Sequence, residues 1–278
     1  MIFVSRRLGR GVARWILYVT AAYFFIFAPG PRRHMRTYLR RALGRTPTAL
    51  DRYRLLLSFA SCVHDRIFFM DDRFELFDVS VEGEQLVDEI LRTGRGAVLM
   101  GGHMGSFEVV RSLARRAPGL GVAVLMYEAN ARKMTTLLAA VNPSQRPEII
   151  SVGHIDAMLR ARARLDAGAF IGMLGDRSLA NDAAVAVDFL GHPAQMPLAP
   201  MRAAALLRAP VVFMLGLYRG ANRYHVVFEP LADFSDVARA QRDAAVGAAV
   251  ARYAALLEKH CRLDPYNWFN FYDFWGRR

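Results

Sequence analysis

The sequence predicts an α/β fold in which a largely parallel sheet carries helices on both faces. From residue 96 onward, short apolar runs alternate with amphipathic stretches of helical length. Each run is apolar at successive positions, which is typical of parallel strands buried on both faces. The runs expected to be strands are 97–100, 122–126, 149–152, 169–174 and 211–215. Strands that alternate with helices in this way form parallel sheets.

The stretches that separate these runs have the spacing of helices. Apolar residues recur at helical intervals in 50–69, 107–116, 131–141, 155–166, 199–208 and the alanine-rich 236–260. Residues 224–228 are expected to add an antiparallel strand. A chain of 278 residues, 54% of them hydrophobic, can bury a substantial core. This composition excludes disordered and disulfide-scaffold proteins.

The amino-terminal part is basic around an apolar segment. The first 50 residues contain ten arginines and no acidic residue, so they carry +10 of the net charge of +12. Between the arginines lies Trp15–Pro31, an uncharged run of 17 residues. A bilayer-spanning helix needs about 20 apolar residues, and its flanks usually differ in arginine content. We therefore expect a helix in or at an anionic membrane surface. A short span and a buried core helix remain the alternatives.

This charge distribution suggests two parts, a membrane anchor over 1–45 and one larger domain over 46–278. A nucleic-acid site is not expected, because the arginines bracket an apolar segment instead of alternating with stacking aromatics. A metal site is not expected either. Cys62 and Cys261 are far apart in sequence, and the histidines lack partners at ligand spacing. No cofactor is expected, since no glycine-rich nucleotide loop follows a strand.

The strongest candidate for catalysis lies where a predicted strand ends and a helix begins. The segment there reads Gly-Gly-His-Met-Gly-Ser-Phe-Glu over 101–108. Gly102 and Gly105 allow a sharp turn and close approach of a substrate. His103 can serve as a base, and Glu108 can orient the imidazole if it points back from the first helical turn. A helix-capping turn with a solvated Glu108 is the alternative.

Two further groups of polar residues follow predicted strands. Asp176 and Arg177 come directly after the run 169–174, so they are expected at the same sheet edge as His103. A surface salt bridge is the alternative for this pair. Asn130 and Arg132 follow the run 122–126 and are expected to line an acceptor site. The alternative for these two residues is a purely structural role.

Several segments together resemble the bacterial lipid A biosynthesis (lauroyl and myristoyl) acyltransferases, within the glycerolipid acyltransferase superfamily. The resemblance includes the basic apolar amino end and the His-x4-Glu pattern of His103 and Glu108. The other matching segments are 172–177, 187–191, 209–212 and the Asp-Pro-Tyr-Asn-Trp sequence of 264–268. Because these segments occur in the family's order, they are more specific than His-x4-Glu alone.

The resemblance implies acyl transfer at the cytoplasmic face of a bacterial inner membrane. The donor would be a thioester of an acyl-carrier protein or of coenzyme A. The acceptor would be a hydroxyl of a lipid or glycolipid. His103 would be the general base and Glu108 would orient it, while amides of 102–105 or Arg177 would stabilise the oxyanion. A hydrolase or thioesterase using water, and a non-catalytic lipid-binding protein, are the alternatives.

Two departures from the family pattern concern the substrates. Met126-Tyr127-Glu128 stands where these enzymes usually carry an arginine, and the segment 268–275 is aromatic where they tend to be basic. A phosphorylated acceptor favours bidentate arginines. The acceptor therefore stays open between lipid A and a less anionic lipid of the aryl polyene type. For an acidic carrier protein, we expect docking on Arg111, Arg115 and Arg116, with a solvated helix face as the alternative.

Overall fold

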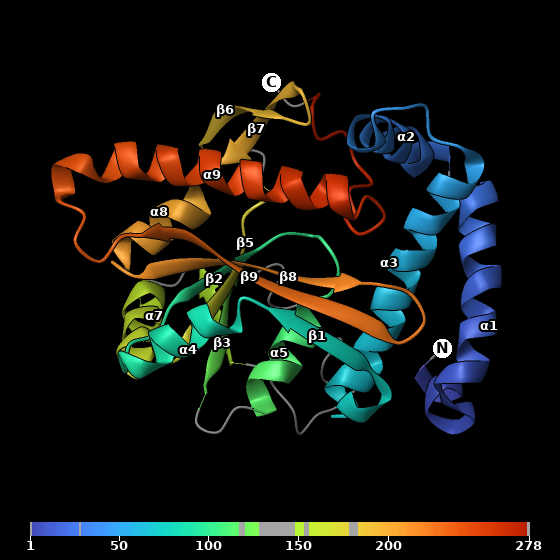
Figure 1. Cartoon of the computed structure of the whole chain (residues 1–278), viewed down its shortest axis with the longest axis horizontal. Helices are drawn as coiled ribbons and strands as arrows, with labels where there is room; N and C mark the ends of the chain where they lie inside the picture. The colour runs from blue at the N-terminus through green and yellow to red at the C-terminus, as the bar shows by residue number, and fades with distance from the viewer. Residues whose placement is uncertain are drawn as a thin grey trace.

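A seven-stranded sheet forms the centre of the molecule (Figure 1). The computed structural model describes residues 2–27, 29–116, 120–127, 148–152, 156–177 and 183–276. The strand order is β1-β9-β8-β2-β5-β3-β4. The strands are β1 (Asp78–Glu82), β2 (Val98–Gly101), β3 (Val122–Tyr127), β4 (Glu148–Val152), β5 (Phe170–Leu174), β8 (Pro210–Tyr218) and β9 (Arg223–Asp233). Strands β6 (Ala184–Phe189) and β7 (His192–Pro197) form a separate antiparallel pair.

The sheet is parallel except where β8 pairs with β9. Helices α8 and α9 lie on one side of it, and α5 and α7 lie on the other (Figure 1). The helices are α1 (Ile2–Phe27), α2 (Pro29–Leu43), α3 (Ala49–Met70), α4 (Glu84–Arg92), α5 (Phe107–Arg116), α7 (Ala157–Asp166), α8 (Ala199–Leu206) and α9 (Arg242–Leu263). The predicted α/β class with a largely parallel sheet is confirmed.

The five continuous apolar runs correspond to β2, β3, β4, β5 and β8. All four residues of β2 are buried, as are eight of the nine in β8. A continuous apolar run therefore indicates a strand that is buried on both faces. The expected antiparallel strand is part of β9. Helix α9 begins at Arg242, six residues later than predicted, because a 3₁₀ turn over Arg239–Gln241 precedes it. The helix expected over 131–141 lies outside the described residues.

The two amino-terminal helices pack against the rest of the protein. Helix α1 contacts α3 along its length, with Ala13, Leu17 and Ala21 buried. Helix α2 places Met35 and Tyr38 in the main hydrophobic core. Helices α1 and α2 therefore lie against the body of the protein in the structure.

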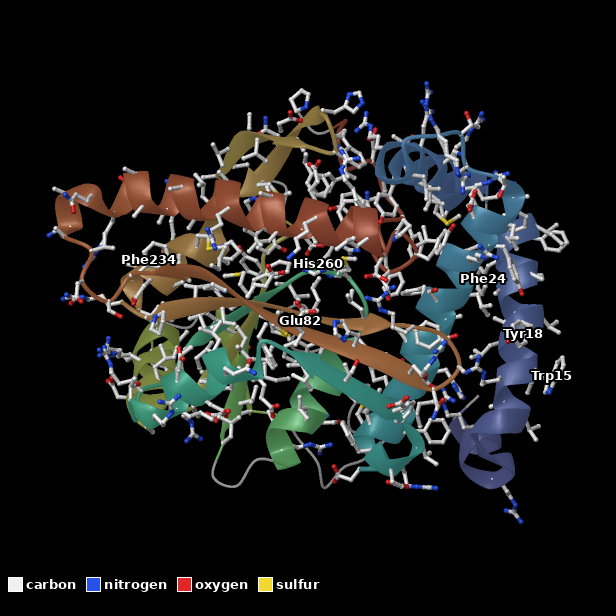
Figure 2. All side chains as sticks on the ribbon, viewed as in Figure 1. Trp15, Tyr18, Phe24, Glu82, Phe234 and His260 are labelled. Atoms are coloured by element: carbon white, nitrogen blue, oxygen red, sulfur yellow. The ribbon has the colours of Figure 1, made fainter. Side chains whose placement is uncertain are left out.

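The outer face of α1 is apolar and exposed. Trp15 and Val19 are 75% and 71% exposed, and Trp15 points away from the rest of the molecule (Figure 2). In the described part of the chain, no one helix combines the length and the hydropathy that crossing a bilayer requires. Among the described helices, one pair, Gly9–Phe27 and Gly30–Leu43, reaches those thresholds together, and the two helices are bent by 98° at the break between them.

A buried ion pair connects α1 to the body. Both oxygens of the Asp65 carboxylate on α3 accept hydrogen bonds of 2.7 Å from the Arg10 guanidinium on α1. The Tyr224 hydroxyl on β9 donates a third, at 3.0 Å. The side chain of Asp65 is 1% exposed and that of Arg10 is 13% exposed. Because a buried charge is tolerated only when it is paired and hydrogen-bonded, this contact holds α1 in place.

We expect Asp65→Asn to lower the free energy of unfolding by about 3 kcal/mol, because it leaves the Arg10 charge unpaired and poorly solvated. Urea unfolding in detergent solution would measure the loss. The control is Glu75→Gln, which removes an ion pair between two side chains that are both more than half exposed. That change should cost less than about 1 kcal/mol. Equal losses in the two variants would show that Asp65 does not anchor α1.

Candidate active site

The register of two parallel strands places His103 beside Asp176. Strand β2 pairs with β5, and Gly101 lies opposite Leu174 at the carboxyl end of each strand. His103 and Asp176 each come two residues later. Both side chains therefore lie at the edge of the sheet where ligands bind in open α/β folds. This agrees with the expectation that Asp176 shares an edge with His103.

The two residues are hydrogen-bonded to each other. Nδ1 of His103 lies 2.8 Å from Oδ1 of Asp176, and the backbone N–H of His103 donates to Oδ2 at 2.8 Å. An ionised carboxylate only accepts hydrogen bonds, so Nδ1 carries the proton and Nε2 is the free, basic nitrogen. The His103 side chain is 32% exposed, so a substrate can reach it. This geometry would allow His103 to act as a general base oriented by a carboxylate.

Asp176 itself is 2% exposed. Burial works to raise its pKa, but the attraction and the hydrogen bond from His103, together with the Arg177 charge, lower the pKa to about 2. The carboxylate is therefore ionised throughout the neutral range. Its burial means that it holds the imidazole from behind, whereas the sequence placed it among substrate-binding residues.

Glu108 makes a different contact from the one expected. Its Oε2 accepts a 2.7 Å hydrogen bond from Nε of Arg111, and its Oε1 lies 3.8 Å from Nε of Arg66 on α3. Glu108 and Arg111 are each about 5% exposed and sit one helical turn apart on α5. The carboxylate that contacts the imidazole is thus Asp176. Glu108 balances the charge of two arginines next to the turn.

The glycines of the turn are required by close packing. Gly105 has φ +70°, and a Cβ there would lie 2.1 Å from the carbonyl oxygen of Gly216. A Cβ on Gly102 would lie 3.0 Å from the Tyr253 hydroxyl and 3.5 Å from the Asp176 carboxyl. Both positions thus face protein atoms closely. The N–H of Gly105 donates to the Asn267 carbonyl at 2.9 Å, so it is not available for an oxyanion.

The remaining predicted residues have separate locations. Arg177 is exposed, and it donates from Nη2 to the Phe269 carbonyl at 2.9 Å. Asn130 and Arg132 lie outside the described residues. Arg111 is buried against Glu108, and Arg115 donates to the Phe69 carbonyl and pairs with Asp72. These contacts engage two of the three arginines that were expected to dock a carrier protein.

Sequence reasoning assigned no role to Trp268, whose side chain contacts the His103–Asp176 pair. The indole Nε1–H of Trp268 donates to Oδ2 of Asp176 at 3.0 Å. Trp268 belongs to the 264–268 segment, which the resemblance singled out without assigning it a role. Among the described residues, no group of three or more His, Cys, Asp or Glu side chains is placed to hold a metal ion.

Comparison with known families identifies the chain. The model of the bacterial lipid A biosynthesis acyltransferase family matches residues 1–277. The chain belongs to this family. The match includes α1 and α2 as well as the sheet, in keeping with the packing of these helices on the body. It supports acyl transfer to a lipid acceptor. A search of curated proteins found no match.

The low pKa of Asp176 predicts how its contribution to stability depends on pH. An unfolded aspartate has a pKa of about 3.9, so the ionised carboxylate stabilises the fold fully above about pH 4 and loses this effect as the pH falls towards 2. Asp176→Asn should therefore lower the free energy of unfolding by about 2–3 kcal/mol at pH 7. This difference from wild type should shrink below pH 4.

Urea unfolding at a series of pH values would measure this difference. Asp236→Asn serves as the control, because Asp236 is exposed in a loop. Its effect should stay within about 0.5 kcal/mol at every pH. A difference for Asp176→Asn that stays constant down to pH 2 would contradict a stabilising ionised carboxylate.

Proposed function

We propose that the protein transfers an acyl chain from a carrier thioester to a hydroxyl of a membrane lipid, with His103 as the general base. The 2.8 Å contact between Nδ1 of His103 and Asp176 supports this role most directly. It leaves Nε2 to accept the proton of the acceptor hydroxyl. The family match supports the acyl transfer, and the geometry supports Asp176, in place of Glu108, as the residue that orients the imidazole.

The reaction proceeds by addition and elimination at the thioester carbonyl. Nε2 of His103 takes the hydroxyl proton while the hydroxyl oxygen bonds to the carbonyl carbon. The negative charge passes to the carbonyl oxygen, and Arg177, exposed next to Asp176, is our candidate to stabilise it. When the carbonyl re-forms, the carbon–sulfur bond breaks. The imidazolium then returns the proton to the leaving thiolate, so no net proton is consumed. The buried negative charge of Asp176 stabilises the imidazolium in between.

Glu108 has a supporting role in this proposal. Its carboxylate holds Arg111 and lies near Arg66, and these contacts join α5 to α3 beside the catalytic turn. A loss of Glu108 leaves Arg111, which is 5% exposed, without its partner. The effect of Glu108→Gln on activity should therefore be accompanied by a loss of stability. Asp176→Asn should lower turnover under conditions in which the protein stays folded.

The first test removes the base. We expect His103→Ala to reduce acyl transfer by about 10²- to 10⁴-fold while the protein stays folded. Transfer of a radiolabelled acyl group from an acyl-carrier thioester to extracted membrane lipids measures this loss. The matched control is His192→Ala, at an exposed position of β7, which should leave the rate unchanged.

The same assay separates transfer from hydrolysis. Released free fatty acid at a rate equal to or above that of lipid acylation would favour a hydrolase that uses the same histidine on water. Near-wild-type transfer by His103→Ala would show that the base is another group.

We also propose that α1 binds the protein to a membrane surface at the cytoplasmic face. Its buried side is covered by α3, whereas its outer side presents apolar residues at helical spacing to solvent. These residues and their exposed fractions are Val12 (48%), Trp15 (75%), Val19 (71%), Tyr23 (57%) and Ile26 (58%). Arginines of the basic amino-terminal part that lie close to the lipid add attraction to anionic headgroups, at about 1 kcal/mol for each one.

The second test changes this apolar face. Trp15→Asp combined with Val19→Asp should lower binding to vesicles of phosphatidylethanolamine and phosphatidylglycerol by at least about tenfold, because each side chain contributes about 1.5–3 kcal/mol when buried. Co-sedimentation would measure the loss. Leu159→Asp is the control, since Leu159 is an equally exposed apolar residue on α7. Unchanged binding of the double variant would show that α1 is not the membrane-binding element.

A further inference from the structure

The segment Pro265–Asn270 lies against the catalytic turn and pairs with it. The Phe269 N–H donates to the His103 carbonyl at 2.8 Å, and the Gly105 N–H donates to the Asn267 carbonyl at 2.9 Å. These two bonds flank an antiparallel bridge between Met104 and Trp268. The carboxyl-terminal segment therefore extends the backbone hydrogen bonding of the turn that carries the base.

This pairing directs Trp268 towards Asp176. Nε1 of the indole lies 3.0 Å from Oδ2, the oxygen that also accepts from the His103 backbone. Trp268 is 1% exposed. Its ring packs edge-on against four aromatic rings, with centroid distances of 4.9 Å to Tyr38, 5.3 Å to Phe189, 5.0 Å to Phe274 and 6.1 Å to Trp275. The indole is thus held in one orientation from several sides.

We propose that Trp268 is a positioning residue of the active site, which fixes the Asp176 carboxylate so that its Oδ1 accepts the imidazole Nδ1–H. This inference rests on the proposed function of His103. Trp268 is too deeply buried to touch a substrate in this structure, so it acts through Asp176. The 264–268 segment therefore forms part of the site's machinery.

The reason lies in the freedom of a carboxyl group. The terminal torsion of an aspartate is broad, so packing alone holds the carboxylate plane weakly. Two donors on Oδ2, from different parts of the chain, leave Oδ1 directed at His103. Hydrogen bonds to a charged group are also the stronger ones. Removal of the indole N–H would free the carboxylate to rotate and would leave its negative charge less compensated.

The expected effect on pH dependence follows from the groups that surround the carboxylate. Arg177 carries a positive charge beside it, His103 becomes positive only when it takes a proton, and Tyr253 and Cys261 of α9 face it as neutral groups. None of these changes when the indole is replaced. Without the indole N–H, the negative charge of Asp176 is less compensated, and it therefore favours the protonated form of the His103 imidazole. The acid limb of the kcat/KM profile should therefore move to higher pH, by about half a unit.

Trp268→Phe is the first experimental variant. It keeps an aromatic ring and removes the N–H. We expect kcat to fall about tenfold with little change in KM, because the substrate contacts are untouched. The matched control is Trp275→Phe in the same aromatic cluster, where the indole donates to the Phe189 carbonyl at 3.3 Å. Its kcat should change less than about threefold and its pH profile should not move.

A double-variant comparison distinguishes positioning from general packing. If Trp268 acts through Asp176, then Trp268→Phe should cost little further activity in an Asp176→Asn background, because the two residues act as a unit. A tenfold loss in both backgrounds would mean that the indole only supports the fold, and it would overturn the proposal. If Trp268→Phe fails to fold, the same comparison can be made with benzothienylalanine at position 268. This residue keeps the shape of the indole and removes only the N–H donor.

A spectroscopic measurement tests the proposal without any substrate. The ¹⁵N resonances of the His103 imidazole report which nitrogen carries the proton. In the wild type we expect Nδ1–H, and in the variant lacking the indole donor a mixture of tautomers. Identical imidazole spectra in the two proteins would overturn the proposal. If the wild type transferred no acyl chain, the proposed function would fail, and these spectra would still decide the role of Trp268.

Discussion

The carboxylate of Asp176 is ionised and almost wholly removed from water, and the site is built around this constraint. An ionised group in that position needs partners for its oxygens, and they come from two distant parts of the chain. The turn after β2 supplies the His103 backbone and ring, and the carboxyl-terminal segment supplies the Trp268 indole. The same contacts that satisfy the charge also set the orientation of the histidine. Stability and the proposed catalytic geometry therefore depend on one group.

Much of the sheet could be predicted because its central strands are buried on both faces and are therefore apolar throughout. Strands β1 and β6 were not predicted, since their residues alternate between exposed and partly buried along most of their length. Strand β7 was also missed, because it contains two prolines and no continuous apolar run. Helix α4 was also missed. The residue that precedes it, Gly83, has a left-handed backbone conformation and no side chain that could cap the helix. The sequence therefore lacks the Ser, Thr, Asp or Asn that usually marks the start of a helix.

Contacts in the candidate site join residues that are distant in sequence, so the sequence predicted them only in part. The spacing of five residues between His103 and Glu108 suggested that these two side chains contact each other, because a sequence pattern reveals only residues that are close along the chain. The imidazole instead contacts a residue 73 positions away, and this depends on which strands are neighbours and in what register. The sequence did place Asp176 at the correct edge. The contact of Trp268 could not be predicted, since it arises from a segment outside any helix or strand of the sheet.

The contact of α2 with the carboxyl-terminal segment has a consequence for biosynthesis. Tyr38 donates to the Pro265 carbonyl across 227 positions of sequence, and its ring packs on Trp268. Contacts between such distant residues form late, because the intervening chain must first be ordered. During translation, the sheet and His103 emerge well before the carboxyl-terminal segment, which supplies the last hydrogen-bond donor to the Asp176 carboxylate. The nascent chain can thus bring His103 beside Asp176 while this carboxylate still lacks the Trp268 donor, and its set of hydrogen-bond partners is complete only when the carboxyl-terminal segment leaves the ribosome.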